Sequence, residues 1–127
     1  MTGEARCVQG DVQVVALDRL QATAIFTVDR SEEVFAGHYP GFAIFPGVCL
    51  VEVVDEAAKK SLKEVVQLTV IESIRFLSPV YPGDELSIAV AWSESVDGLI
   101  LRAVLENGRT VCARARLRYR TERPQVA

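Results

Sequence analysis

The sequence has little of what metal-binding, disulfide-bonded or membrane-spanning proteins need. It contains three cysteines and a single histidine, and no Cys/His cluster has the spacing of a metal site, so we expect no bound metal. Cys7, Cys49 and Cys112 are odd in number and widely spaced, which is typical of free thiols in a reducing compartment. No segment approaches the roughly 20 apolar residues of a membrane span, and no signal peptide is recognisable. The sequence therefore predicts a soluble, cytoplasmic protein.

A strong charge of one sign is also missing. The formal net charge is −3, and no block of like charges resembles a nucleic-acid-binding arm, so nucleic acid is not an expected partner. Half of the 127 residues are apolar, which is enough for one core without disulfides or metals. We expect a single domain over residues 1–127, with Thr121 to Ala127 as a frayed tail.

One helical pattern stands among several strand patterns. Residues 11–28 predict two half-buried strands or one long bent strand pair, and a helix is predicted to begin between Pro46 and Val48 and to run to about Lys63. Four further strands are expected at Val65 to Leu77, Glu85 to Trp92, Leu99 to Leu105 and Arg109 to Tyr119. Asn107-Gly108 predicts a type I′ hairpin turn between the last two. The order favours an α+β fold in which an antiparallel sheet of about five to six strands covers one long helix.

Two titratable residues stand out near the start of the predicted helix. His38 lies in a loop rich in glycine and proline, and Glu52 interrupts an apolar string within the helix. Each has an ordinary explanation, because a loop histidine is most often a surface or hydrogen-bonded residue and Glu52 would open the polar face of the helix. The residue pattern alone does not decide between this explanation and a catalytic pair.

A longer string carries a family resemblance. Residues Phe35 to Val48 have the pattern F-x-G-H-Y-P-x-x-x-x-x-P-G-V, followed by Glu52, and resemble the hot-dog-fold 3-hydroxyacyl-[acyl carrier protein] dehydratases of fatty-acid and polyketide synthesis. A second stretch, Arg75 to Leu86, resembles the strand and turn that follow the helix in that family. The resemblance implies a hot-dog fold, with a curled antiparallel sheet around the helix. It also implies a dimer in which each active site takes its histidine from one subunit and its acid from the other.

The resemblance assigns a role to three residues. His38 would be the base that removes the α-proton, Glu52 the acid that protonates the departing hydroxyl, and Gly47 an oxyanion donor at the helix N-terminus. A free glutamate has a pKa near 4.3 and must be desolvated to keep a proton at neutral pH. We expect its apolar helix neighbours to provide this desolvation, namely Leu50, Val51, Val53 and Val54. The scheme requires no metal and no organic cofactor.

The chain departs from the family pattern at three positions. Ala43 replaces a usual proline, Phe45 a frequent methionine, and Glu56 a usual glutamine. Phe45, Val48 and Glu56 are expected to contact the substrate, and Glu56 either repels Glu52 or turns to Lys59 and Lys60 as a solvated residue. The departures keep a second hypothesis open, a non-catalytic or half-site subunit of a heterodimeric dehydratase. A hot-dog acyl thioesterase is a less favoured third.

The last predicted strand carries a row of arginines. Arg114, Arg116, Arg118 and Arg120 alternate with apolar residues, so all four lie on one face of the sheet. The resemblance implies an acyl carrier protein with a phosphopantetheine-linked acyl chain as partner, and we expect this acidic protein to dock at Arg114, Arg116 and Arg118, with help from Arg75 or Arg102. The alternative is an ordinary solvated sheet face. The expected assembly is a homodimer, or a heterodimer with a related hot-dog subunit.

Overall fold

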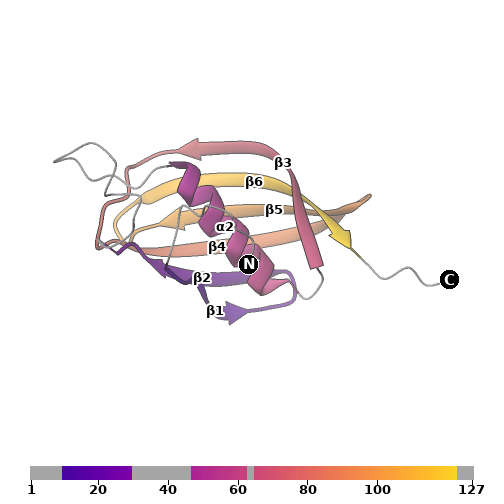
Figure 1. Ribbon diagram of the computed structural model, residues 1–127, viewed down its shortest axis with the longest axis horizontal. Coiled ribbons are helices and arrows are strands. Elements are labelled where there is room, and N and C mark those ends of the chain that lie inside the picture. The colour runs from indigo at the N-terminus through magenta and orange to yellow at the C-terminus, as the bar shows by residue number, and fades with distance from the viewer. Residues whose placement is uncertain (1–9, 30–46, 63–64, 123–127) are drawn as a thin grey trace, which may run out of the picture.

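The computed structural model describes residues 10–29, 47–62 and 65–122. This part of the chain forms six strands and a helix: β1 (Gln13–Leu17), β2 (Gln21–Thr27), α2 (Gly47–Ser61), β3 (Val65–Phe76), β4 (Glu85–Ser95), β5 (Gly98–Glu106) and β6 (Val111–Glu122). The strands pair antiparallel in one sheet, in the order β1-β2-β4-β5-β6-β3 (Figure 1). The strands β1 and β3 are therefore the two edges.

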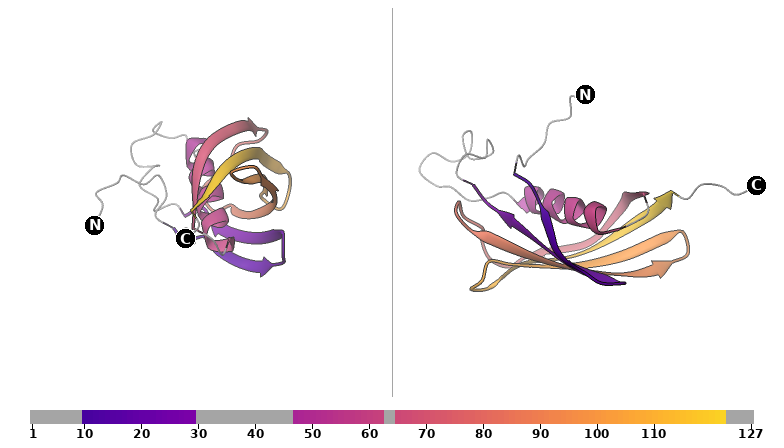
Figure 2. Two further views of the ribbon diagram at one scale, coloured as in Figure 1. Left: turned by 90° about the vertical axis from the view of Figure 1, so that its right-hand side faces the viewer. Right: turned by 90° about the horizontal axis from the view of Figure 1, so that it is seen from below.

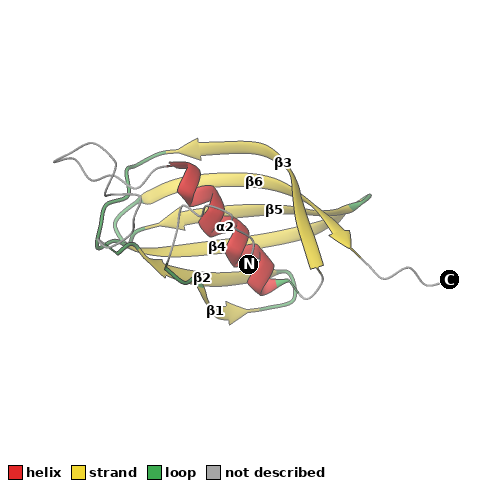
Figure 3. Cartoon of the chain, in the orientation of Figure 1, coloured by secondary structure: helices red, strands yellow, loops and turns green. Residues whose placement is uncertain are grey.

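The sheet curls around the helix. The right-hand view of Figure 2 shows the strands bending into a trough, with α2 lying along its concave side. Figure 3 shows the same arrangement by secondary structure, with the helix in red crossing the yellow strands. The predicted α+β hot-dog architecture is confirmed, and six strands lie at the upper end of the predicted number.

A stripe of apolar side chains holds α2 in this trough. Its buried residues recur at helical spacing and are Cys49, Leu50, Val53, Val54, Ala57, Ala58 and Ser61. Each of the larger buried side chains, Leu50, Val53 and Val54, contributes about 1.5–3 kcal/mol through its removal from water. The helix ends at Ser61, whose hydroxyl donates to the carbonyl of Ala57 at 2.7 Å, a little before the predicted end at Lys63. In the last turn of the helix, Lys60 donates to Asp11 at 2.8 Å and to the carbonyl of Val12 at 2.7 Å.

Alternation along the strands fills the other side of the core. On β5, Leu99, Leu101, Ala103 and Leu105 are buried and face the helix, whereas the residues between them are less buried. The edge strand β1 differs from its prediction, because Val15 and Leu17 are more than half exposed. An edge strand with one neighbour has less of its surface covered than an inner strand. The expected tail is also shorter, since β6 continues through Thr121 and Glu122, which pair with β3.

The two hairpins after β4 are built differently. Val96 and Asp97 connect β4 to β5, and a side chain at Gly98 would collide with the backbone carbonyl of Tyr119 on β6. The type I′ turn predicted at Asn107-Gly108 is wrong, because β5 ends at Glu106 and β6 begins only at Val111. The amide oxygen of Asn107 accepts hydrogen bonds from the backbone N–H groups of residues 109 and 110 at 3.0 and 3.1 Å. This side chain closes a four-residue loop in which Gly108 has a φ of 89°.

Candidate active site

The described end of the first motif, Gly47 and Val48, and part of the second motif line one hollow. This open, largely apolar hollow of about 510 Å³ is lined by Gly47, Val48 and Leu50 from the first turn of α2, and by residues 76–80 from the segment after β3. That segment is held by backbone hydrogen bonds, since the N–H groups of Leu77 and Ser78 both donate to the carbonyl of Cys112, at 2.8 and 3.2 Å. The hollow therefore lies where the helix presents its unpaired N–H groups and the positive end of its dipole.

A turn fixes the far end of the second motif. Asp84 accepts a hydrogen bond from the backbone N–H of Tyr81 at 2.9 Å, and Gly83 has a φ of 93°. The N–H of Gly83 donates to the carbonyl of Val28 at 2.6 Å, and the N–H of Val28 donates to the backbone carbonyl of Asp84 at 2.8 Å. This exchange anchors the turn to the end of β2 and so positions the wall of the hollow.

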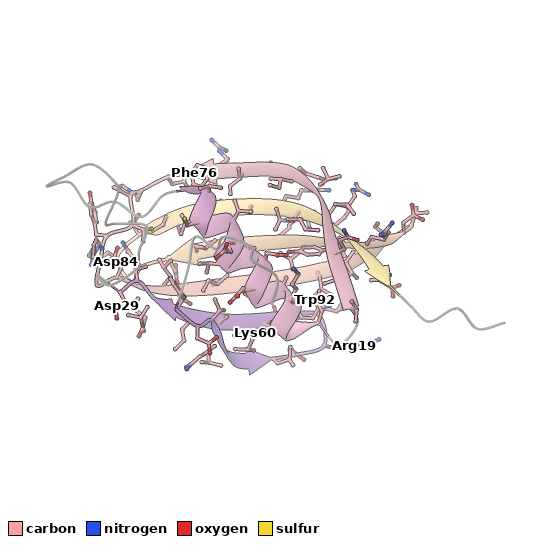
Figure 4. All side chains as sticks on the ribbon, in the orientation of Figure 1. Arg19, Asp29, Lys60, Phe76, Asp84 and Trp92 are labelled. Carbon is pink, nitrogen blue, oxygen red and sulfur yellow. The ribbon has the colours of Figure 1, made fainter. Side chains whose placement is uncertain are left out.

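Gly47 is the first residue of α2, as expected for an oxyanion donor. The structure shows a second reason for a glycine at this position, which is its close contact with Phe76. A β-carbon at Gly47 would lie 2.7 Å from Cζ of Phe76, so the ring of Phe76 already occupies the space that a side chain would need. Figure 4 shows Phe76 at the amino-terminal end of α2. The glycine makes room for an aromatic ring of the same chain, a contact that the sequence analysis did not anticipate.

Val48, Glu52 and Glu56 follow one another at intervals of four residues and therefore share one flank of α2. Val48 is 68% exposed and lines the hollow, and its contact with substrate stays a prediction. Both glutamates are half-buried. This flank lies away from the buried stripe by which α2 packs on the sheet.

The expected apolar surroundings of Glu52 are only partly present. Leu50, Val53 and Val54 are buried against the sheet, on the other side of the helix, and only Val51 is half-buried near the flank of Glu52. His38 and Phe45 lie outside the described residues. The meeting of His38 with Glu52 therefore stays a prediction, as does the contact of Phe45 with substrate.

The lysines expected near Glu56 are engaged by other carboxylates. Lys59 pairs with Asp55 at 3.0 Å, and Lys60 pairs with Asp11 at 2.8 Å. Asp55 also accepts a hydrogen bond from the phenol of Tyr119 on β6 at 2.7 Å. Burial, and the negative charge of Asp55, raise the pKa of Tyr119 far above its ordinary value. This pair fastens the middle of the helix to the sheet.

The arginine row lies on the outer face of the sheet, as predicted. The residues between the arginines of β6, namely Ala113, Ala115, Leu117 and Tyr119, are all buried on the helix side. Glu72 on β3 binds two of the arginines, Arg116 at 2.7 Å and Arg118 at 2.6 Å, and these hydrogen bonds lower the pKa of Glu72. The sequence analysis missed this ion-pair network because two register shifts in β3, before and after residues 70–71, break the alternation that places Glu72.

Four other arginines of this face, Arg75, Arg102, Arg114 and Arg120, form no ion pair with the described acids, and Arg120 donates to the amide oxygen of Gln67 at 2.9 Å. Arg75 and Arg114 are direct cross-strand neighbours, and Arg102 lies opposite Arg116. Like charges opposite each other in a sheet are destabilising, and Arg75 and Arg114 form such a pair at the end of β3 that carries Phe76.

Within residues 10–29, 47–62 and 65–122, no three His, Cys, Asp or Glu side chains converge as a metal site would require. In the same part of the chain, no helix combines the length and the apolar character needed to cross a bilayer.

Comparison with known proteins places this geometry in a family. Residues 15–115 match the family model of the ApeI-like dehydratases, described as ApeI dehydratase. The chain is 31% identical over 105 residues to the 3-hydroxyacyl-[acyl-carrier-protein] dehydratase FabZ of Thermus thermophilus, and the match covers 74% of each chain. The family model extends across the described helix and most of the sheet.

Solved structures share the fold at lower sequence identity. The dehydratase heterocomplex ApeI:P from Xenorhabdus doucetiae superimposes with a TM-score of 0.78 at 19% identity, over 89% of this chain and 99% of that chain. A hypothetical thioesterase with coenzyme A from Streptococcus pneumoniae has a TM-score of 0.74 at 14% identity, over 88% and 86% of the two chains. Because a dehydratase and a hypothetical thioesterase share this fold, the fold alone does not assign the family, and the assignment depends on the sequence matches. The chain therefore belongs to the ApeI-like dehydratases and is a hot-dog dehydratase related to the 3-hydroxyacyl-[acyl-carrier-protein] dehydratases.

Proposed function

We propose that the chain is a cytoplasmic enzyme that eliminates water from a 3-hydroxyacyl thioester on an acyl carrier protein, giving the trans-2-enoyl thioester for fatty-acid or polyketide synthesis. One observation carries the proposal. Gly47 and Val48, at the end of the first dehydratase motif, and residues 76–80 of the second line the same hollow at the N-terminus of α2, although the motifs are far apart in the sequence. The family match and the relative's printed activity support this reaction class.

The proposed reaction uses two proton transfers. The C–H bond at the α-carbon breaks and its proton passes to the imidazole of His38, while a double bond forms between the α- and β-carbons. The C–O bond at the β-carbon breaks, and the departing oxygen takes a proton from Glu52 and leaves as water. The thioester oxygen, which gains negative charge, accepts a hydrogen bond from the N–H of Gly47. Return of the proton from His38 to Glu52 resets the enzyme.

A second protomer completes the site in this proposal. Glu52 lies on the flank of α2 that the sheet of its own chain does not cover, so a partner that packs there would desolvate the carboxyl group. The free edge strand β3 offers a place for pairing, because it is 12 residues long and exposes Val70 and Ile71 by 45% and 48%. Long edge strands with exposed apolar residues tend to pair with another chain.

The dimer can be tested at this edge. We expect Val70→Lys to shift the protein from dimer to monomer in size-exclusion chromatography with light scattering. Val15→Lys on the opposite edge strand is the matched control, since Val15 is also half-exposed, at 56%, and it should leave the dimer intact. A dimer that survives Val70→Lys and dissociates with Val15→Lys would place the interface on β1 instead.

The activity test compares wild type with His38→Ala and Glu52→Gln on a 3-hydroxyacyl carrier substrate. Loss of a general acid or base lowers kcat by about 100-fold or more, whereas Glu94→Gln, an exposed glutamate on β4, should not change it. Co-expression of the two inactive variants tests the shared site. Half of the dimers are then mixed and each has one intact site, so about a quarter of the activity returns. A site within one protomer would recover nothing.

The heterodimer hypothesis has a specific observation in its favour. The solved ApeI:P assembly, whose fold this chain shares, is a dehydratase heterocomplex. If this chain works in the same way, the purified protein alone is inert and gains activity when mixed with a related hot-dog subunit. Product analysis separates both hypotheses from a thioesterase, which would release a free acid instead of an enoyl thioester.

The structure changes which arginines we propose for docking of the acyl carrier protein. Glu72 neutralises part of the charge of Arg116 and Arg118, so these two contribute less than predicted. Arg114, together with Arg75 and Arg102, keeps its charge, and Arg75 directly precedes Phe76 in the wall of the hollow. An acidic carrier docked on these three residues would have its pantetheine arm beside the proposed site.

Charge reversal tests this docking surface. We expect Arg75→Glu and Arg114→Glu to raise KM for a carrier-bound substrate at low salt and to leave KM for the same acyl-pantetheine unchanged, because the small substrate has no carrier to attract. Arg19→Glu is the charge-matched control, since Arg19 lies at the opposite end of the molecule from Phe76 (Figure 4). Equal effects on both substrates, or an equal effect of Arg19→Glu, would contradict docking at this surface.

A further inference from the structure

The ring of Phe76 sits directly on the proposed oxyanion site. A methyl group on Gly47 would lie 2.7 Å from Cζ, 2.8 Å from Cε1 and 3.1 Å from Cε2 of this ring. Carbon atoms in ordinary contact are about 3.5–4.0 Å apart, so the ring fills the place of the missing side chain. The space beside Gly47 is therefore a shaped wall of the hollow, made by the chain itself.

The backbone of Phe76 is held by the sheet while its ring borders the hollow. Phe76 ends β3 and pairs with Ala113 of β6, and its side chain remains 53% exposed. Ring and hollow are thus in contact with solvent and with any ligand that enters. A half-exposed aromatic ring at the rim of a binding hollow commonly contacts a ligand or a partner.

We propose that Phe76 determines which acyl thioesters the enzyme accepts, excluding those with a substituent on the α-carbon. The inference rests on the proposed function, in which the thioester oxygen accepts a hydrogen bond from Gly47. The α-carbon is bonded to the same carbonyl carbon as that oxygen. A methyl group on the α-carbon would consequently meet the ring that covers Gly47, whereas an unbranched chain passes it.

The test compares 3-hydroxyhexanoyl-pantetheine with 2-methyl-3-hydroxyhexanoyl-pantetheine. We expect Phe76→Ala to raise kcat/KM for the branched substrate, relative to the unbranched one, by about tenfold or more, which is the usual effect of one methyl group in a shaped pocket. Phe76→Leu should give an intermediate ratio. Leu20→Ala is the matched control, because Leu20 is exposed to the same 53% and lies in the turn before β2. An unchanged ratio in both Phe76 variants would overturn the proposal.

A binding measurement separates this inference from the proposed function. If wild type does not dehydrate the unbranched substrate, the proposed function fails, and the specificity is then read from calorimetric titration with the two amide analogues, in which nitrogen replaces sulfur. Phe76→Ala should improve the affinity for the branched amide relative to the unbranched amide. An equal change for both amides would overturn the role of Phe76 whatever the reaction.

Thermal denaturation tests the contact itself. Alanine is a better helix former than glycine, so Gly47→Ala should raise the melting temperature in the Phe76→Ala background, where the ring is gone. In the wild-type background the same change displaces the ring, and the melting temperature should rise less or fall. The same shift in both backgrounds would show that the two residues do not interact.

Discussion

The phenol of Tyr119 on β6 donates a 2.7 Å hydrogen bond to Asp55 on α2, across the interior of the fold. Tyr119 is 1% exposed, and Asp55 holds Lys59 with its second oxygen at 3.0 Å. This polar contact fixes the rotation of α2 about its own axis, and it lies at Asp55, three residues after Glu52.

Removing this hydrogen bond should destabilise the fold. We expect Tyr119→Phe to lower the free energy of unfolding by about 1–2 kcal/mol, because the partly buried carboxylate of Asp55 loses its donor. Tyr81→Phe is the control, since Tyr81 is 42% exposed and should change stability by less than about 0.5 kcal/mol. Urea denaturation measures both. Equal effects of the two substitutions would contradict the structural role of the Tyr119 hydroxyl.

The raised pKa of Tyr119 predicts an alkaline loss of stability. The unfolded phenol releases its proton near pH 10, while the folded one keeps it, so stability is fully present below the unfolded pKa and is lost as pH rises toward the folded pKa. Burial is the first cause of the raised value and the charge of Asp55 the second. We expect the decline of stability above about pH 10 to be shallower in Tyr119→Phe than in wild type. A decline of unchanged slope would argue against a protected phenol.

Glu72 predicts the opposite dependence in acid. Its pKa is lowered first by the hydrogen bond from Arg118 and then by that from Arg116, so its contribution is present above the unfolded pKa and disappears as pH falls through the folded one. We expect Glu72→Gln to lose less stability than wild type between neutral pH and about pH 3. Glu94→Gln, on β4, should follow wild type in the same denaturation series.

Substitution by alanine should destabilise the protein to different extents at Gly108 and Gly98. Gly108 has a φ of 89° with open space around it, and Gly98 has the carbonyl of Tyr119 in the place of a side chain. Gly108→Ala should cost about 1 kcal/mol through backbone strain alone. Gly98→Ala should cost about 3 kcal/mol or more, because strand backbone must move. Denaturant midpoints of the two variants measure this order, and a reversed order would contradict the packing of the β5–β6 pair.

The periodicity of apolar residues was sufficient to predict those features that depend on the local sequence pattern. The alternation along β6 correctly placed Arg114, Arg116 and Arg118 on the outer face, and the spacing of apolar residues correctly placed the helix. Contacts between distant segments carry no such signal. Phe76 covers Gly47 only because β3 ends beside the start of α2, and Glu72 reaches two arginines only because β3 contains irregularities.

The hairpin error has a similar origin. Asn107-Gly108 fits a two-residue turn by residue type, but the side chain of Asn107 bonds to two backbone N–H groups and thereby closes a longer loop. Side-chain bonds of this kind compete with regular turn geometry and are not visible in a dipeptide. The helix that carries the candidate acid and the motif that forms the wall of the hollow were both accessible from the sequence, whereas the contact of Phe76 with Gly47 was not.

The close packing of Gly98 against β6 affects residues far from the hairpin in which it lies. Any side chain there would press on the backbone of Tyr119, the residue that holds Asp55 and with it the helix that bears the candidate acid. A mutational screen for activity would accordingly score this hairpin as though it belonged to the catalytic machinery. The loss of activity would come from displacement of Tyr119 on β6 and not from a lost contact with substrate.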